Sequence, residues 1–198
     1  MTLQVLDTEI LLFINHGLAN GFFDVLMPAL TLHGYLLIIP YLLAIFLRGA
    51  KQENDQGKTF LAAAVWTFLI ACAAAYLAGW VEDWIKDIIA RPRPCRVVEG
   101  VRLLLPCPGS FSMPSGHAIS SFAFALPLWH LTRRYIEPLW RFYPLFLAGM
   151  IAFSRIYLGA HYPTDVLVGA LLGGAIGLAL SLLYEVMGTE EGIRRHRK

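Results

Sequence analysis

The sequence has little charge and few cysteines. Charged residues make up 15% of its 198 residues and hydrophobic residues 57%, whereas a typical soluble domain is about 25% charged. So much apolar surface needs lipid around it, and we therefore expect an integral membrane protein. The cysteines do not suggest a zinc site, because their spacing supplies too few ligands. No dense carboxylate cluster suggests a magnesium site either, so no metal or other cofactor is expected.

The chain also lacks an internal linker, so we expect one domain over residues 1–198. The N-terminus has neither the basic start nor the small-residue cleavage site of a signal peptide, and its first hydrophobic stretch is expected to be retained. A net charge of +2 gives no reason to expect a nucleic-acid partner.

Apolar runs of helical length predict an all-α bundle that crosses the membrane several times. The expected spans are residues 36–47, 60–80, 114–131, 139–153 and 166–186. The second is rich in alanine, and the last carries Gly169, Gly173 and Gly177 at four-residue spacing. Small residues of this kind let neighbouring helices approach closely.

The N-terminal stretch 3–32 differs from these spans because polar residues interrupt it, among them Asp7, Glu9 and Asp24. A spanning helix would have to bury these carboxylates, so we expect an amphipathic helix at the membrane interface. The alternative is a tilted first span, which would give six spans instead of five.

The basic residues set the orientation. Ten of them fall on one side of this topology, which the positive-inside rule makes the cytoplasmic side: Arg48, Lys51, Lys58, Arg133, Arg134, Arg141, Arg194, Arg195, Arg197 and Lys198. The other six lie on the outer side, against the rule: Lys86, Arg91, Arg93, Arg96, Arg102 and Arg155. Such an outer cluster suggests an anionic ligand.

Residues 91–114 form the one long loop, which we expect to be functional because polar motifs frame it. The chain must leave the helix at Arg91-Pro92-Arg93-Pro94, since residues that precede proline favour extended geometry. Cys95 and Cys107 lie in this outer loop, where they either form a disulfide or remain free thiols.

Polar residues in three separate stretches converge at this outer level. Lys86 offers a compact charge and Arg93 a planar fork of donors, which together suit the oxygens of a phosphate. Ser115 is a good N-cap for the following helix. Gly116 beside it lets a bound group approach the backbone N–H groups, which favour anions.

The third stretch holds His161 and Asp165 on either side of Pro163, which suits the first turn of the last helix. Asp165 is expected to reach the His161 ring, which would keep one ring nitrogen protonated and leave the other free as a nucleophile or base. Each stretch alone has an ordinary explanation, such as a helix cap or charges that reach the interface. Their coincidence at one level favours a single site.

These residues resemble the complete three-part signature of the type 2 phosphatidic acid phosphatase superfamily. In chain order the three parts are Lys86 with Arg93-Pro94, then Pro114-Ser115-Gly116-His117, then Ser154-Arg155 with His161 and Asp165. The resemblance covers residues 86–165 and implies a membrane-embedded, metal-independent phosphatase. It implies that His161 attacks phosphorus, that Asp165 orients His161, and that His117 protonates the leaving oxygen. The residues it assigns to phosphate binding are Lys86, Arg93, Ser115, Gly116, Ser154 and Arg155.

We therefore expect a multi-pass lipid phosphate or diphosphate phosphatase whose site faces the extracytoplasmic side of an inner membrane. The first candidate substrate is undecaprenyl diphosphate, and phosphatidylglycerophosphate and lipid A 1-phosphate are alternatives. A lipid-to-lipid phosphotransferase would use the same phosphohistidine, whereas an anion carrier or channel would not need either histidine. The soluble vanadium-dependent haloperoxidases have similar motifs, but this chain is too apolar to be one of them.

Overall fold

Long helices account for most of the structure, a computed structural model that describes residues 2–50, 55–134 and 136–196. The α-helices are α1 (Leu3–Leu12), α2 (Gly21–His33), α3 (Ile38–Ala50), α4 (Asp55–Ile89), α5 (Pro94–Val97), α6 (Gly116–Leu131), α7 (Pro138–Arg141), α8 (Tyr143–Tyr157) and α9 (Pro163–His196). Shorter helical turns of other types are the π-helix η1 (Phe13–Gly17) and the 3-10 helices η2 (Gly34–Leu37) and η3 (Thr132–Arg134). No strand occurs in the ranges described, and the predicted all-α bundle is confirmed.

Among the described residues, three helical segments are long and apolar enough to cross a membrane. They are Gly21–Arg48, which runs through α2, η2 and α3, then Phe60–Val97 and Pro163–Gly188. The two remaining expected spans are shorter helices, since α6 has 16 residues and α8 has 15. Both pack inside the bundle, where α6 contacts α4, α8 and α9.

Small residues hold the centre of the bundle together, as their spacing predicted. A Cβ atom at Gly169 would come within 2.8 Å of the Ser115 carbonyl oxygen, and one at Gly177 within 2.6 Å of the Ala123 carbonyl oxygen. The glycines of α9 therefore lie directly against the backbone of α6. The alanine-rich helix α4 packs on α6 in the same way, and its Ala74 and Ala78 are fully buried.

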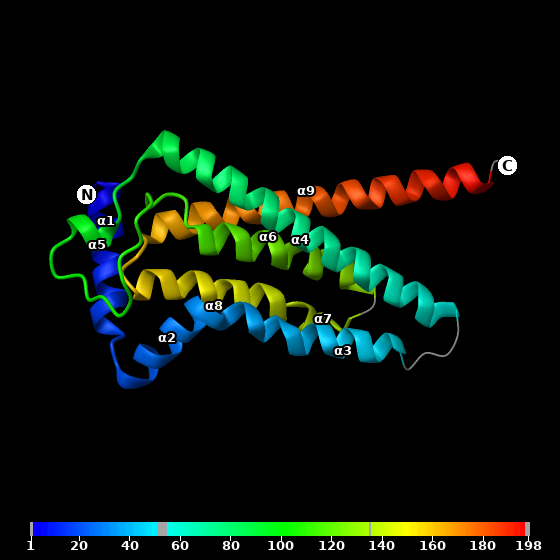
Figure 1. Ribbon diagram of the computed structural model, residues 1–198, viewed down its shortest axis with the longest axis horizontal. Coiled ribbons are helices and arrows are strands. Elements are labelled where there is room, and N and C mark those ends of the chain that lie inside the picture. The colour runs from blue at the N-terminus through cyan, green and yellow to red at the C-terminus, as the bar shows by residue number, and fades with distance from the viewer. Residues whose placement is uncertain (1, 51–54, 135, 197–198) are drawn as a thin grey trace.

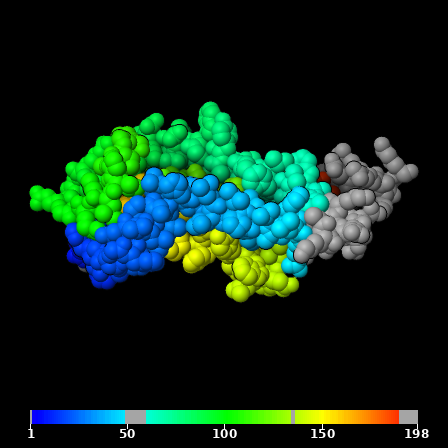
Figure 2. Space-filling model, turned by 60° about the horizontal axis from the view of Figure 1, so that its bottom comes forward, coloured from blue at the N-terminus to red at the C-terminus, as the bar shows by residue number. Residues whose placement is uncertain are grey.

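The structure divides the N-terminal stretch 3–32, which the sequence predicted as one interfacial region, into two parts. Helix α1 lies across one end of the bundle, whereas α2 turns to run along it (Figure 1). The break falls at Asn20, whose side chain accepts a hydrogen bond from the Phe23 N–H across 3.0 Å and so begins a new helix. Residues 21–32 thus belong to the first long apolar segment. Figure 2 shows this segment lying lengthwise between α4 and α8.

The carboxylates that pointed to an interfacial helix have partners within the protein. Asp7 of α1 is 2% exposed and is bound by Arg91. Asp24 of α2 receives two hydrogen bonds from Arg102, across 2.9 and 2.8 Å. Because arginines from the loop at residues 91–114 neutralise them, these carboxylates do not need to face water. The sequence shows the charges but not their partners. Residues 21–32 form part of an apolar segment long enough to cross a membrane, and the interfacial position of residues 3–32 stays a prediction.

Candidate active site

His161 lies in the tight connection between α8 and α9 and is 1% exposed. Gly159 has a φ of +68°, which turns the chain back at the end of α8. The His161 ring makes two short contacts: Nδ1 is 2.7 Å from the Ser112 carbonyl oxygen, and Nε2 is 2.7 Å from Nη1 of Arg93. A carbonyl oxygen only accepts and a guanidinium only donates. Nδ1 must therefore carry the hydrogen, and the lone pair is on Nε2.

The surroundings of His161 keep its ring neutral. Burial, helped by the positive charges of Arg93 and Arg155, lowers the pKa of His161 from an ordinary 6.5 to about 3, although Asp165 acts in the opposite direction. At neutral pH the imidazole is thus uncharged. Only this form has the free electron pair that a nucleophile needs.

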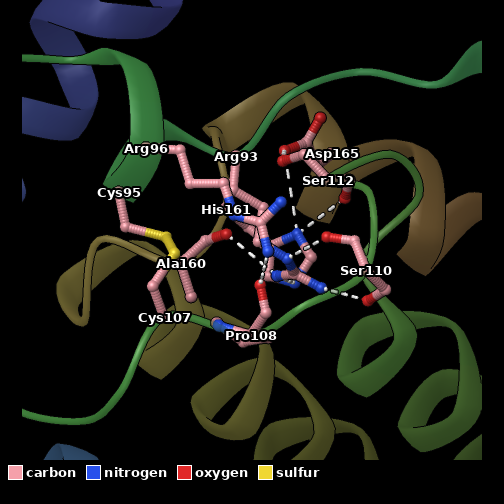
Figure 3. The surroundings of a disulfide bond; sticks show 10 residues. All are labelled: Arg93, Cys95, Arg96, Cys107, Pro108, Ser110, Ser112, Ala160, His161 and Asp165. Atoms are coloured by element: carbon pink, nitrogen blue, oxygen red, sulfur yellow. Dashed lines mark hydrogen bonds and ion pairs between the residues drawn. A yellow bond between two sulfur atoms is a disulfide. The ribbon is translucent and has the colours of Figure 1, made fainter.

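Arg93 is fixed from several sides (Figure 3). Its Nε donates to the Ser110 carbonyl oxygen across 2.8 Å, Nη2 donates to the Ser110 hydroxyl across 2.9 Å, and Nη1 also donates to the Ala160 carbonyl oxygen across 3.0 Å. Arg93 is 3% exposed, and these hydrogen bonds hold its guanidinium in one orientation before any ligand arrives. This preorganisation lowers the entropy lost when an anion binds.

Asp165 stands in the first turn of α9 and is completely buried. Its carboxylate accepts hydrogen bonds from Nη1 of Arg91 across 2.6 Å, from the Tyr162 N–H across 2.9 Å and from the Ser112 hydroxyl. Its distance to Nδ1 of His161 is 3.7 Å. The two residues are neighbours, as the sequence predicted, but the close acceptor for the ring hydrogen is the Ser112 carbonyl oxygen. Asp165 acts on the ring mainly through its charge.

A disulfide joins Cys95 of α5 to Cys107, which decides between the two states that the sequence left open. The cysteines have a sequence separation of 12 and a Cα–Cα distance of 6.0 Å. Arg96 adds a hydrogen bond to the Pro108 carbonyl oxygen across 2.8 Å. The disulfide and this hydrogen bond close the loop on itself. The part of the loop that follows Cys107 brings Ser110 and Ser112 beside Arg93 and His161 (Figure 3).

A second group of site residues surrounds the N-terminus of α6. Ser115 is the N-cap residue, as predicted, but its hydroxyl makes no capping hydrogen bond and is buried without a partner in the described part of the chain. Its N–H donates to the Asp165 carbonyl oxygen across 3.0 Å. Lys86 is 7% exposed and pairs with Glu82, one turn earlier on α4. Both Glu82 carboxylate oxygens lie so close to Gly116 that a Cβ atom there would overlap them.

His117 and Arg155 line a cavity of about 250 Å³ together with Thr31 and Ala160. Arg155 donates from Nη1 to the Thr31 hydroxyl across 3.3 Å, while its buried Nε has no partner among the described residues. The Ser154 hydroxyl lies 2.6 Å from the Thr31 hydroxyl and donates to the Ile151 carbonyl oxygen. Ser154 therefore steadies Thr31 against Arg155, and the cavity keeps cationic donors available to an anion.

Several residues at this site are given no individual role by the sequence: Asp7, Glu82, Arg91, Ser110, Ser112 and Thr31. The first three carry charge beside apolar runs, where charged residues are often functional. Arg91 is also one of the outer basic residues, but the sequence does not indicate its contact with Asp165. Nothing in the sequence marks Ser112, because its close contact with His161 is made by a main-chain carbonyl.

The described residues contain no group of three or more His, Cys, Asp or Glu side chains that could hold a metal ion. The positive charge at this site comes instead from the side chains of Lys86, Arg91, Arg93 and Arg155. Their donors can take the place of a cation around phosphoryl oxygens.

Comparisons with known proteins show to which family the chain belongs. Residues 64–187 match the model of the PAP2 superfamily. The chain is 30% identical over 185 residues to the lipid A 4'-phosphatase of Bacteroides thetaiotaomicron, which covers 87% of this chain and 74% of that protein. It is also 30% identical over 166 residues to the undecaprenyl-diphosphatase of Bacillus subtilis, and this alignment covers 82% of this chain and 76% of that protein. The crystal structure of Aquifex aeolicus LpxE superposes with a TM-score of 0.66 at 25% identity, over 88% of this chain and 94% of that one.

The helical bundle has segments long and apolar enough to cross a membrane, and the relatives over most of the chain are phosphatases, so this protein is an integral-membrane phosphatase. The chain belongs to the PAP2 superfamily, as the resemblance implied.

Proposed function

We propose that this protein hydrolyses the terminal phosphate of a membrane lipid phosphate or diphosphate through a phosphohistidine at His161, with undecaprenyl diphosphate as its preferred substrate. The observation that carries the proposal is the state of His161. Its ring is neutral, its hydrogen is held on Nδ1 by the Ser112 carbonyl oxygen, and its Nε2 lone pair faces the guanidinium of Arg93. A nucleophile beside a fixed phosphate-binding cation is what phosphoryl transfer requires.

In the first step, Nε2 of His161 attacks phosphorus while the bond from phosphorus to the leaving oxygen breaks. Arg93 exchanges its hydrogen bond to Nε2 for one to a phosphoryl oxygen. Arg155, Lys86 and the free N–H groups at the start of α6 bind the remaining oxygens. His117, which lines the cavity beside Arg155, gives its proton to the leaving oxygen.

In the second step, water attacks the phosphohistidine. His117, now without its proton, accepts one from the water, and the Nε2–phosphorus bond breaks to release inorganic phosphate. The phosphorylated imidazole carries positive charge during this cycle. The buried carboxylate of Asp165, 3.7 Å from Nδ1, stabilises that charge.

An apolar groove supports a lipid as the leaving group. A cavity of about 260 Å³ between α3, α4, α6 and α8 is lined almost entirely by apolar side chains such as Phe68, Phe124 and Leu147. Tyr35 lines this groove, and its ring centroid lies 6.3 Å from that of His117. We place the hydrocarbon chain of the substrate in this groove, with its phosphate beside the histidines.

The choice of substrate and membrane side rests on the relatives and on the charge pattern. The Bacillus subtilis relative is an undecaprenyl-diphosphatase, and the Bacteroides relative is a lipid A 4'-phosphatase. The basic residues at the opposite end of the bundle favour the cytoplasm there, which supports our proposal that His161 faces the extracytoplasmic side of an inner membrane. Phosphatidylglycerophosphate and lipid A 1-phosphate are the substrates to compare.

The test is phosphate release by purified protein in detergent with EDTA, from a panel of undecaprenyl diphosphate, phosphatidylglycerophosphate, phosphatidic acid and lipid A. We expect release of phosphate from undecaprenyl diphosphate above the others. His161→Ala should abolish turnover and still bind vanadate, because it removes the nucleophile and keeps the cations. Substantial hydrolysis by this variant would refute the phosphohistidine.

The same assay separates hydrolysis from transfer when the terminal phosphate is labelled. Label that appears in solution supports a phosphatase, whereas label on a second lipid would show a phosphotransferase. Loss of activity in EDTA with recovery on adding a divalent metal would contradict a reaction driven by side-chain cations.

A further inference from the structure

Glu82 is an acidic side chain placed where the proposed reaction needs positive charge. It lies on α4 one turn before Lys86, and the two side chains are only 15% and 9% exposed. An i,i+4 pair of this kind is ordinary on a solvated helix face. Here the pair is buried, and it points at a second helix instead of at water.

The position of the Glu82 carboxylate is unusual because two features of a phosphate site converge on it. Its oxygens pair with Lys86 and lie against Gly116, where the absent Cβ leaves room for them. Gly116 opens α6, whose first N–H groups have no acceptor in the helix and attract negative charge. Glu82 is also close enough to Arg93 to act on it electrostatically.

A buried hydroxyl next to Gly116 in the chain has no hydrogen-bond partner among the residues that the structure describes. The Ser115 Oγ caps nothing and is unpaired in the described part of the chain, although it is the residue next to Gly116. The site therefore has more donors than the carboxylate satisfies. A phosphate has more acceptor oxygens than a carboxylate, and it would match this set better.

We propose that Glu82 is an internal anion that occupies the phosphate position of the ligand-free enzyme and is displaced from Lys86 and Gly116 by phosphate. This inference rests on the proposed function, and it adds a competitor within the same site. Glu82 keeps Lys86 and the α6 N-terminus paired while no substrate is present. It also opposes retention of the inorganic phosphate product, because it competes for the same partners after hydrolysis.

The test measures binding of inorganic phosphate and of vanadate to the purified full chain in detergent, by calorimetry and by the rise in unfolding temperature. Glu82→Gln keeps the shape of the side chain and removes its charge. We expect it to bind both anions about tenfold more tightly than the wild type, which corresponds to about 1.4 kcal/mol. The phosphate-induced rise in unfolding temperature should grow accordingly.

Asp83→Asn is the matched control, since it removes the same charge from the neighbouring, exposed residue of α4. Its phosphate affinity should stay within about twofold of the wild type, because exposed charges are screened. Glu82→Asp provides a second variant that keeps the charge but withdraws it by one methylene from Gly116. It should also bind phosphate more tightly than the wild type, by a smaller factor than Glu82→Gln.

A purely structural Glu82 would give a different pattern. Glu82→Gln would then lower the unfolding temperature and leave phosphate affinity unchanged or weaker, which would overturn the inference. Absence of phosphate and vanadate binding in every variant would overturn it as well. In turnover, Glu82→Gln should lower KM and the inhibition constant of phosphate together. A wild type that binds phosphate but hydrolyses none of the lipids would refute the proposed function, and the affinity ratio of the variants would still decide the role of Glu82.

Discussion

Arg91 donates a hydrogen bond to Asp165 across 2.6 Å and so ties the loop that follows α4 to the first turn of α9. Its other terminal nitrogen donates to Asp7 of α1 across 2.7 Å, and its guanidinium lies 4.0 Å from the ring centre of Tyr162. Asp7 in turn accepts a hydrogen bond from the Thr164 N–H across 2.9 Å. The N-terminal helix is therefore connected to Asp165, the residue proposed to stabilise the nucleophile.

Asp7→Asn tests this connection. The change removes the charge that Arg91 shares with Asp165, so we expect kcat to fall roughly tenfold with little change in KM, because small displacements of a catalytic group are costly. Steady-state kinetics on the best lipid of the panel measures the split. Glu9→Gln, an exposed acid of the same helix, is the control and should behave as the wild type. An Asp7→Asn enzyme with unchanged kcat would show that α1 has no role in positioning Asp165.

Asp165→Asn should lower kcat by about two to three orders of magnitude, less than the loss of about 10⁴ seen when a catalytic histidine takes up the wrong tautomer. The Ser112 carbonyl oxygen still holds the Nδ1 hydrogen of His161 in this variant. What is lost is the negative charge near the ring and an acceptor for Arg91. Single-turnover rates at saturating substrate measure the effect. A fall as large as that of His161→Ala would mean that Asp165, and not Ser112, sets the tautomer.

The low pKa of His161 predicts how stability changes with acid. Burial lowers this pKa from 6.5 to about 3, so between these values the unfolded chain binds a proton at the ring that the folded chain does not. The contribution of His161 to the free energy of unfolding is thus fully present above pH 6.5 and is lost progressively as the pH falls toward 3. Going from about pH 7 to about pH 4, His161→Gln should lose about 3 kcal/mol less stability than the wild type. Denaturant unfolding in detergent at both pH values gives the comparison, and equal losses would contradict a buried neutral ring.

The Cys95–Cys107 disulfide should matter for stability and for rate. Replacing both cysteines with serine opens a loop with a sequence separation of 12, which costs about 3 kcal/mol on the chain-entropy model. Ser110 and Ser112 would then hold Arg93 and His161 less firmly, so we expect a lower kcat. Activity before and after mild reduction of the wild type provides a second measurement. Cys72→Ser, which changes a cysteine outside the disulfide, is the control.

Much of the fold and part of the site could be predicted from the sequence, because they depend on local patterns. The glycines at every fourth position of α9 predicted close packing, and they lie against the α6 backbone. The polar groups of the three motifs predicted a gathering of charges, and Arg93, His161 and Asp165 are in contact or nearly so.

Contacts between distant parts of the chain could not be read in this way. Asp7 and Thr164 are separated by 157 positions, and neither residue alone marks the other as a partner. Asp7 and Asp24 suggest a water-facing helix as long as only the sequence is considered, because nothing in it marks Arg91 and Arg102 as their partners. The Ser112 carbonyl oxygen is a main-chain group that every residue possesses, and Glu82 has the spacing of an ordinary surface ion pair with Lys86.

The bond from α1 to the first turn of α9 also sets an order of assembly. During synthesis, α1 emerges first and has no partner for its Asp7 carboxylate until Arg91 and then Thr164 have left the ribosome. Closing so long a stretch of chain has a high entropic cost, so this contact is expected to form late. A nascent chain therefore lacks this contact until α9 has entered the membrane, and we expect phosphatase activity to begin only with that insertion.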